Sequence, residues 1–177
     1  ADVAVFELQA SSAGKLNCAI SLQMPAEMNF PKGLKTKCLH TKDYLNIRVN
    51  YAAPMDTIGY EGGIRVKQKG GSSFLRNDTL YIKDASEILL LSQTQKYPEN
   101  CEAEWNKGLL KKGLDAIRAN YNGLLKAHKA LHTSIYNRVR IDLGATPQER
   151  SLSNEELLEK QKNTDQPVLA LWERIFD

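Results

Sequence analysis

The sequence predicts an α+β protein in which an antiparallel β-sandwich is followed by helices. Up to Tyr97, apolar and polar residues alternate with the period of two that marks half-buried strands. After Pro98, apolar residues recur every three or four positions, the spacing of one helical face. We therefore expect a sandwich portion at 1–97, linker helices with a returning strand at 98–152, and the start of a further helical domain at 153–177.

The composition is typical of a globular protein. The 177 residues include 24 Lys and Arg against 21 Asp and Glu, a net charge of +3, and 42% are hydrophobic. No stretch approaches the roughly 18 apolar residues of a membrane-spanning helix, and no signal-peptide pattern opens the chain. Basic residues alternate with acidic ones without a stripe of aromatic residues, so we expect no nucleic-acid partner.

The first two predicted strands differ in pattern. Residues 3–8 form a mostly apolar run, which is typical of a strand buried on both faces. In the next strand Leu16, Cys18, Ile20 and Leu22 alternate with small or polar residues, which predicts a half-buried strand.

Turn residues separate the later strands. Asn77-Asp78 predicts a hairpin turn, and the pairs Gly62-Gly63 and Gly70-Gly71 are interpreted as hairpin glycines. The continuous apolar run at 88–91 favours a central strand. Seven or eight short strands in all predict a sandwich of antiparallel sheets, and those after the second are expected at 35–41, 45–51, 64–69, 80–82 and 88–91.

One apolar seam runs through the helical part. Its members lie three or four residues apart: Leu110, Leu114, Ile117, Tyr121, Leu124, His128, Leu131 and Ile135. Asn and Gly residues at 120–123 favour two helices, near 103–119 and 121–136, over one long rod. Alternation at 138–143 predicts a short strand that returns to the sheet.

Two more helices are expected after residue 152. Ser153 followed three residues later by Glu156 has the spacing of a capping box. Pro167 is expected in the first turn of the last helix, whose apolar face carries Leu169, Trp172, Ile175 and Phe176.

The three cysteines, Cys18, Cys38 and Cys101, lie far apart and form no CxxC motif, which argues against a zinc ribbon or a redox pair. Cys18 is interpreted as a small buried apolar residue. A Cys18–Cys38 bridge stays open, and so does the redox state of all three thiols.

The chain contains none of the strong local catalytic motifs, so we expect no catalytic residue, metal site or cofactor. His128 and His132 have the i, i+4 spacing of a metal pair, but we interpret His128 as a packed residue of the seam. Trp172 is expected in core or interdomain packing, whereas Trp105 is left open.

Two pairs of carboxylates have the residue types of a glycosidase acid–base pair, Glu102 with Glu104 and Glu155 with Glu156. Both pairs lie on polar faces or first turns of predicted helices. We therefore interpret them as solvated residues or as partners of the helix dipole.

The most specific patterns of the chain are 121–128 (YNGLLKAH) and 136–144 (YNRVRIDLG). Together with further segments they resemble the alpha-L-fucosidase-like glycoside hydrolases of family 95, and these segments are 3–8, 12–17, 60–66, 70–71, 80–85, 93–97 and 169–177. The resemblance implies the later strands of the family's N-terminal sandwich, half of a galactose-mutarotase-like super-sandwich, followed by its linker helices. It also implies a secreted or periplasmic protein.

In that family a toroid of paired helices carries the groups that invert the sugar's configuration, and none of them has a counterpart here. The resemblance therefore implies a non-catalytic portion that supports and orients a catalytic domain absent from this chain. The alternative is a free-standing carbohydrate-binding or protein-assembly module. Strands that lack neighbours are expected to be covered by the helical seam or by a second copy of the chain.

Overall fold

The computed structural model describes residues 2–24, 30, 32–138 and 140–176. The chain divides into two compact units, residues 1–121 and 122–177, and each is described by itself. The first unit holds all the described strands and two helices, and the second holds the remaining helices. The boundary at 121/122 falls inside the segment that the sequence assigns to linker helices.

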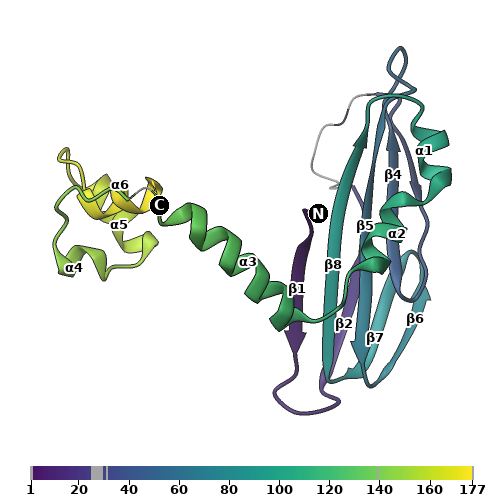
Figure 1. Cartoon of the computed structure of the whole chain (residues 1–177), viewed down its shortest axis with the longest axis horizontal. Helices are drawn as coiled ribbons and strands as arrows, with labels where there is room; N and C mark the ends of the chain where they lie inside the picture. The colour runs from purple at the N-terminus through teal and green to yellow at the C-terminus, as the bar shows by residue number, and fades with distance from the viewer. Residues whose placement is uncertain (1, 25–29, 31, 139, 177) are drawn as a thin grey trace. The chain divides into compact units, whose positions relative to one another are not determined.

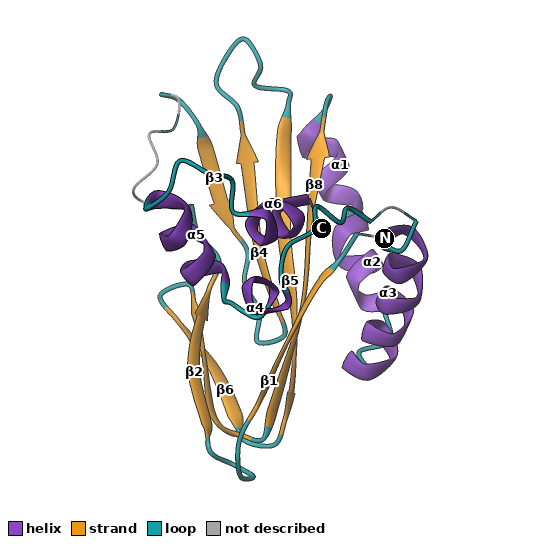
Figure 2. Ribbon diagram, turned by 90° about the vertical axis from the view of Figure 1, so that its left-hand side faces the viewer, coloured by secondary structure: helices purple, strands orange, loops and turns teal. Residues whose placement is uncertain are grey.

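The first unit is a sandwich of two antiparallel sheets, as predicted (Figures 1 and 2). The larger sheet has the order β1 (Ala4–Gln9), β8 (Glu87–Tyr97), β5 (Gly59–Lys69), β4 (Tyr44–Asn50), β3 (Lys35–Cys38). The smaller sheet has the order β2 (Leu16–Ser21), β7 (Thr79–Ala85), β6 (Ser72–Arg76).

The core of the first unit lies between the two sheets. It contains buried residues of both sheets, among them Leu45 and Val66 from the larger and Leu80 and Ile82 from the smaller. Half-buried side chains of β2 pack against it, as their alternation predicts. β8 lies between β1 and β5, which confirms that 88–91 is part of an interior strand.

The prediction that residues 3–8 are buried on both faces is wrong. β1 pairs with β8 on one side only, and Phe6 and Leu8 are 56% and 38% exposed. A short apolar run predicts a strand but does not show whether that strand lies inside a sheet or at its edge, because neither kind needs alternating polar residues.

The two glycine pairs have different roles. Gly70 and Gly71 adopt positive φ angles in the turn that joins β5 to β6, as predicted. Asn77 and Asp78 also have positive φ and form the β6–β7 hairpin turn. Gly62 and Gly63 instead lie inside β5, opposite Ile47 and Asn46, so their interpretation as hairpin glycines is wrong.

Helices cover the outer face of the larger sheet. The segment expected as one helix over 103–119 forms α1 (Cys101–Lys107) and α2 (Leu109–Ala116), separated by Gly108 at φ 61°. α2 packs on β5 and β8 through buried Leu110 and Leu114.

The apolar seam expected along both helices does not form one packed face. α3 (Tyr121–Tyr136) has the expected bounds, but it buries none of its residues, and Leu131 and Ile135 are exposed. Two hydrogen bonds from Arg65 Nη1 to the carbonyls of Leu114 and Ile117 hold the chain at the end of α2. The first residues of the seam, Leu110 and Leu114, therefore pack on the sheet, whereas the residues from Leu124 onward belong to the second unit.

The second unit contains α4 (Pro147–Arg150), α5 (Asn154–Lys162) and α6 (Leu169–Phe176). Its small core includes Ala145, Leu157, Val168 and Leu171. Ser153 and Glu156 form the predicted capping box of α5. α6 begins at Leu169, so Pro167 precedes its first turn, and α4 was not predicted.

The predicted returning strand is not formed. Residues 140–143 have no strand structure, and residue 139 lies outside the described residues. The backbone N–H groups of Leu143 and Ala145 donate to Glu173 Oε1, at 2.7 and 3.3 Å. The Glu173 carboxylate of α6 therefore accepts the hydrogen bonds that these N–H groups would donate to a neighbouring strand in a sheet.

Candidate functional site

A cluster of polar side chains, all buried except the half-buried Arg48, lies between the larger sheet and helices α1 and α2. We call it the Glu61 cluster, and it comprises Tyr44, Asn46, Arg48, Glu61 and Tyr97. Tyr44, Asn46 and Arg48 alternate along β4 and share the face turned toward the helices, because residues i and i+2 of a strand point the same way. Arg48 lies directly opposite Glu61 of β5.

Glu61 is the centre of this cluster and is only 2% exposed. Its Oε1 accepts from Asn46 Nδ2 at 3.0 Å and from Arg48 Nε at 3.1 Å. Its Oε2 accepts from the Tyr97 hydroxyl at 3.0 Å. A buried carboxylate needs such partners, because leaving it unpaired costs several kcal/mol.

The cluster fastens α1 to the sheet. Arg48 Nη2 donates to the backbone carbonyl of Trp105 at 3.0 Å, and the Arg48 guanidinium lies 5.7 Å from the centre of the Trp105 ring. Trp105, which the sequence left open, is buried and meets Tyr97 edge to face. Asn46 Nδ2 also donates to the Tyr44 hydroxyl at 3.2 Å.

Two glycines of β5 make room for this packing. A Cβ at Gly63 would lie 2.6 Å from the Tyr44 hydroxyl and 3.1 Å from Leu110 Cδ2. A Cβ at Gly59 would lie 2.5 Å from the Val49 carbonyl oxygen and 3.0 Å from the Trp105 ring. Neither glycine has positive φ, so close approach of the neighbours accounts for them.

The electrostatics of the cluster keep its phenols neutral. Burial and the neighbouring Glu61 carboxylate raise the pKa of Tyr44 to about 12. Burial and the hydrogen bond to Glu61 also raise the pKa of Tyr97 well above its ordinary value. Since both Glu61 oxygens are engaged and the side chain is buried, the arrangement suits a structural role.

A polar pocket of about 520 Å³ lies at the nearby end of the sandwich. It is lined by the end of β4, the loop before β5 and the start of α1, and its side chains include Lys35, Asn50, Asp56, Glu102 and Asn106. These side chains offer both hydrogen-bond donors and acceptors, the pattern that sugar hydroxyls require. No aromatic ring lines the pocket.

The three cysteines are free thiols, so the Cys18–Cys38 bridge is not formed. Cys101 is buried at the wall of the polar pocket, where Asn50 Nδ2 lies 2.8 Å from its Sγ. Burial raises the pKa of Cys18, Cys38 and Cys101 alike. A raised thiol pKa disfavours the thiolate, which is the nucleophilic form.

A second buried carboxylate, Glu173, organises the helical unit. Arg150 donates from Nε to Glu173 Oε2 and from Nη2 to Oε1, both at 2.9 Å. Arg150 Nη2 also contacts Asp142 Oδ1 at 2.6 Å. These Arg150 hydrogen bonds, aided by the N–H groups of Leu143 and Ala145, lower the pKa of Glu173 to about 2. The side chains of Asp142, Arg150 and Glu173, together with Arg140 and Arg174, line a polar hollow of about 180 Å³.

The histidine pair of α3 is exposed, so the interpretation of His128 as a packed residue is wrong. The His128 and His132 rings stack at 5.6 Å between centroids, and the His132 and Tyr136 rings at 5.5 Å. The described residues bring together no group of three His, Cys, Asp or Glu side chains suited to a metal ion.

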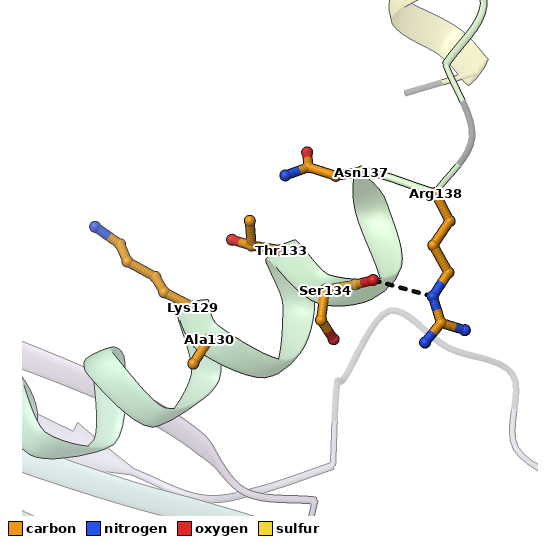
Figure 3. A pocket seen from close by; sticks show the side chains of 6 residues that line it. All are labelled: Lys129, Ala130, Thr133, Ser134, Asn137 and Arg138. Carbon is orange, nitrogen blue, oxygen red and sulfur yellow. Dashed lines mark hydrogen bonds between the residues drawn. The ribbon is translucent and has the colours of Figure 1, made fainter.

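A shallow hollow of about 600 Å³ lies further along the same helix, and Figure 3 shows the side chains that line it. Its six side chains all come from residues 129–138, and Arg138 Nε donates to the Ser134 carbonyl at 3.1 Å. Since one helical segment supplies the whole lining, no second wall encloses a ligand there.

The carboxylate pairs weighed from the sequence do not form acid–base pairs. Glu104 binds Lys107 at 2.6 Å, and Glu102 is exposed. Glu156 belongs to the capping box, and Glu155 is exposed in the first turn of α5. Trp172, which was expected in core or interdomain packing, is 52% exposed.

The helices of the described segments include none with both the length and the apolar character needed to cross a bilayer. No family model matches the chain, and no curated protein matches it significantly.

Proposed function

We propose that this chain is the non-catalytic sandwich-and-linker portion of an alpha-L-fucosidase-like glycoside hydrolase of family 95. In this account it supports and orients a catalytic helical domain that lies outside these 177 residues. It acts on alpha-L-fucosyl or related glycans through that domain, in a secreted or periplasmic setting. The sequence resemblance supplies the family, and one feature of α6 supplies the physical support.

That feature is a second apolar face on α6. Ala170, Leu171 and Glu173 turn toward the core of the unit and are buried. Trp172, Ile175 and Phe176 share the opposite face at i, i+3 and i+4, and each is more than half exposed. A helix that is apolar on two sides is typical of one that packs between two partners. A further helix, as in a toroid of paired helices, would cover this face.

The buried carboxylates support the same account. Glu61 and Glu173 are each held by an arginine that also contacts a further segment of its own unit, Trp105 for Arg48 and Asp142 for Arg150. Buried carboxylates whose oxygens are all engaged hold the surrounding elements in one arrangement, which is what a supporting module needs.

The test is to read the coding sequence on both sides of these residues and to assay the polypeptide that it encodes. We expect a helix-rich continuation and hydrolysis of 4-nitrophenyl alpha-L-fucoside by the longer polypeptide, with no turnover by the 177-residue chain. Turnover by the 177-residue chain that a point substitution within it abolishes would overturn the proposal, as would a reading frame that closes after Asp177.

A carbohydrate-binding module is the second candidate, and the polar pocket beside Cys101 favours it. Amide, ammonium and carboxylate groups there match the mixed donor and acceptor character of sugar hydroxyls. Calorimetric titration with L-fucose and D-galactose tests it. Binding that Asn106→Ala abolishes would favour this module over the supporting role.

A further inference from the structure

β1 is an open edge of the larger sheet. Its six residues pair in unbroken antiparallel register with β8, from Ala4 opposite Ser92 to Gln9 opposite Glu87. No described strand lies on its other side. An edge of this kind presents unpaired backbone N–H and C=O groups, which bind another strand unless something prevents it.

The other three edges of the sandwich carry features that discourage strand pairing. β3 is four residues long and carries Lys35 and Lys37. β2 has a register irregularity between Leu16 and Cys18. β6 is five residues long and ends at Arg76. Short length, lysine and bulges are the devices that protect edges in native sheets. β1 has no bulge in its pairing with β8 and contains no Lys, Arg or Pro.

The inner face of β1 is also uncovered. Phe6 lies opposite Leu90 and Leu8 opposite Ile88, and these β8 residues belong to the core between the sheets. Directly opposite residues share a face, so Phe6 and Leu8 point to the side occupied by the smaller sheet. Phe6 and Leu8 are nevertheless 56% and 38% exposed, because the three-stranded sheet is too narrow to cover the whole face of the five-stranded sheet.

We propose that β1 pairs with β1 of a second copy of this chain, antiparallel and about a two-fold axis at Phe6. In this arrangement the inner faces of both copies lie on the same side of the joined sheet. Directly opposite residues share a face, so an inner residue of one copy, such as Phe6 or Leu8, must lie opposite an inner residue of the other. Because inner residues of β1 have even numbers, the numbers of two opposite residues must add up to an even sum. A sum of 12 places Phe6 opposite its own copy, Ala4 opposite Leu8, and Val5 opposite Glu7. The two Phe6 side chains form an aromatic cross-strand pair, which is stabilising.

Charge selects this register over the next one. A sum of 14 places Glu7 directly opposite Glu7 of the second copy, and like charges directly opposite are destabilising. A sum of 10 leaves Leu8 without a partner within β1. The single charge of β1 therefore favours the register centred on Phe6, in which each Glu7 faces an uncharged Val5.

The predicted contact between Val5 and Glu7 allows a test by charge. Val5→Lys places a lysine opposite Glu7 of the second copy, whereas Val5→Glu places a second carboxylate there. Both variants replace the same half-buried residue by a charged one, so they share any cost to the fold of the monomer. Circular dichroism and thermal melting check that both variants are folded.

Sedimentation equilibrium at micromolar concentration measures the dimer. We expect a wild-type dimer, and a dissociation constant at least about ten-fold higher for Val5→Glu than for Val5→Lys. Phe74→Glu, at the β6 edge, is the matched control and leaves the dimer intact. A monomeric wild type, equal effects of the two Val5 variants, or loss of the dimer in Phe74→Glu would overturn the proposal. None of these results depends on fucoside hydrolysis, so the proposed function is tested separately.

Discussion

Arg48 and Trp105, 57 positions apart in sequence, are joined by a hydrogen bond of 3.0 Å from the guanidinium to the backbone carbonyl. The same guanidinium holds the buried Glu61 carboxylate at 3.1 Å. One side chain of β4 thus connects the sheet to α1 while neutralising the most buried charge of the sandwich. Whether this connection is required for the fold can be measured directly.

Arg48→Met is expected to destabilise the sandwich by about 3–5 kcal/mol, because it leaves Glu61 buried without its charge partner. Arg48→Met combined with Glu61→Gln is expected to recover part of that loss, since no uncompensated charge then remains. Urea denaturation measures both. Lys162→Met, which breaks an exposed pair with Glu159, is the control and should cost less than about 1 kcal/mol. Equal losses in the single and double variants would contradict the role assigned to the pair.

Gly63→Ala is expected to destabilise the chain, because its Cβ would lie 2.6 Å from the Tyr44 hydroxyl. Gly113→Ala is the matched control, since Gly113 lies within α2 and a Cβ there meets nothing within 4 Å. It should stabilise the chain by up to about 1 kcal/mol through helix propensity. Thermal melting of both variants measures the difference, and a neutral Gly63→Ala would show that Tyr44 and Leu110 do not close over Gly63 as described.

The burial of the Glu61 cluster could not be predicted from the sequence of β4. Alternation along β4 correctly shows that Asn46 and Arg48 share one face, but a polar face indicates water as readily as a buried hydrogen-bond network. What covers them is α1 and α2, more than 50 residues later in the chain. Tertiary cover of this kind has no local signal.

Local signals performed better. The capping box of Ser153 and Glu156 and the Asn77-Asp78 hairpin turn were both predicted, because each depends on residues within one turn of chain. The returning strand at 138–143 was wrong because Glu173, some 30 residues away, binds the backbone of Leu143. Trp172 has the spacing of a core face, but its helix has two apolar faces, and periodicity does not say which one is buried.

Acid should unfold the helical unit through Glu173. Its pKa is lowered from 4.5 to about 2 in the folded chain, so the stability it contributes is present above pH 4.5 and is lost as pH falls toward 2. In a Trp105→Phe background, Trp172 fluorescence reports this unit alone. Glu173→Gln is expected to weaken the transition in that pH range, to which Glu149 and Glu156 also contribute, whereas Glu155→Gln, at an exposed carboxylate, leaves it unchanged. An unchanged acid transition in Glu173→Gln would contradict the assignment.

The account's central claim is that a further domain packs on the Trp172 face of α6. Acrylamide quenching of Trp172 tests it most directly, in Trp105→Phe versions of the 177-residue chain and of the longer polypeptide encoded by the same reading frame. We expect Trp172 to be strongly quenched in the 177-residue chain and protected in the longer polypeptide. Equal quenching in both would show that this face stays in solvent and that the chain does not support a catalytic domain through α6.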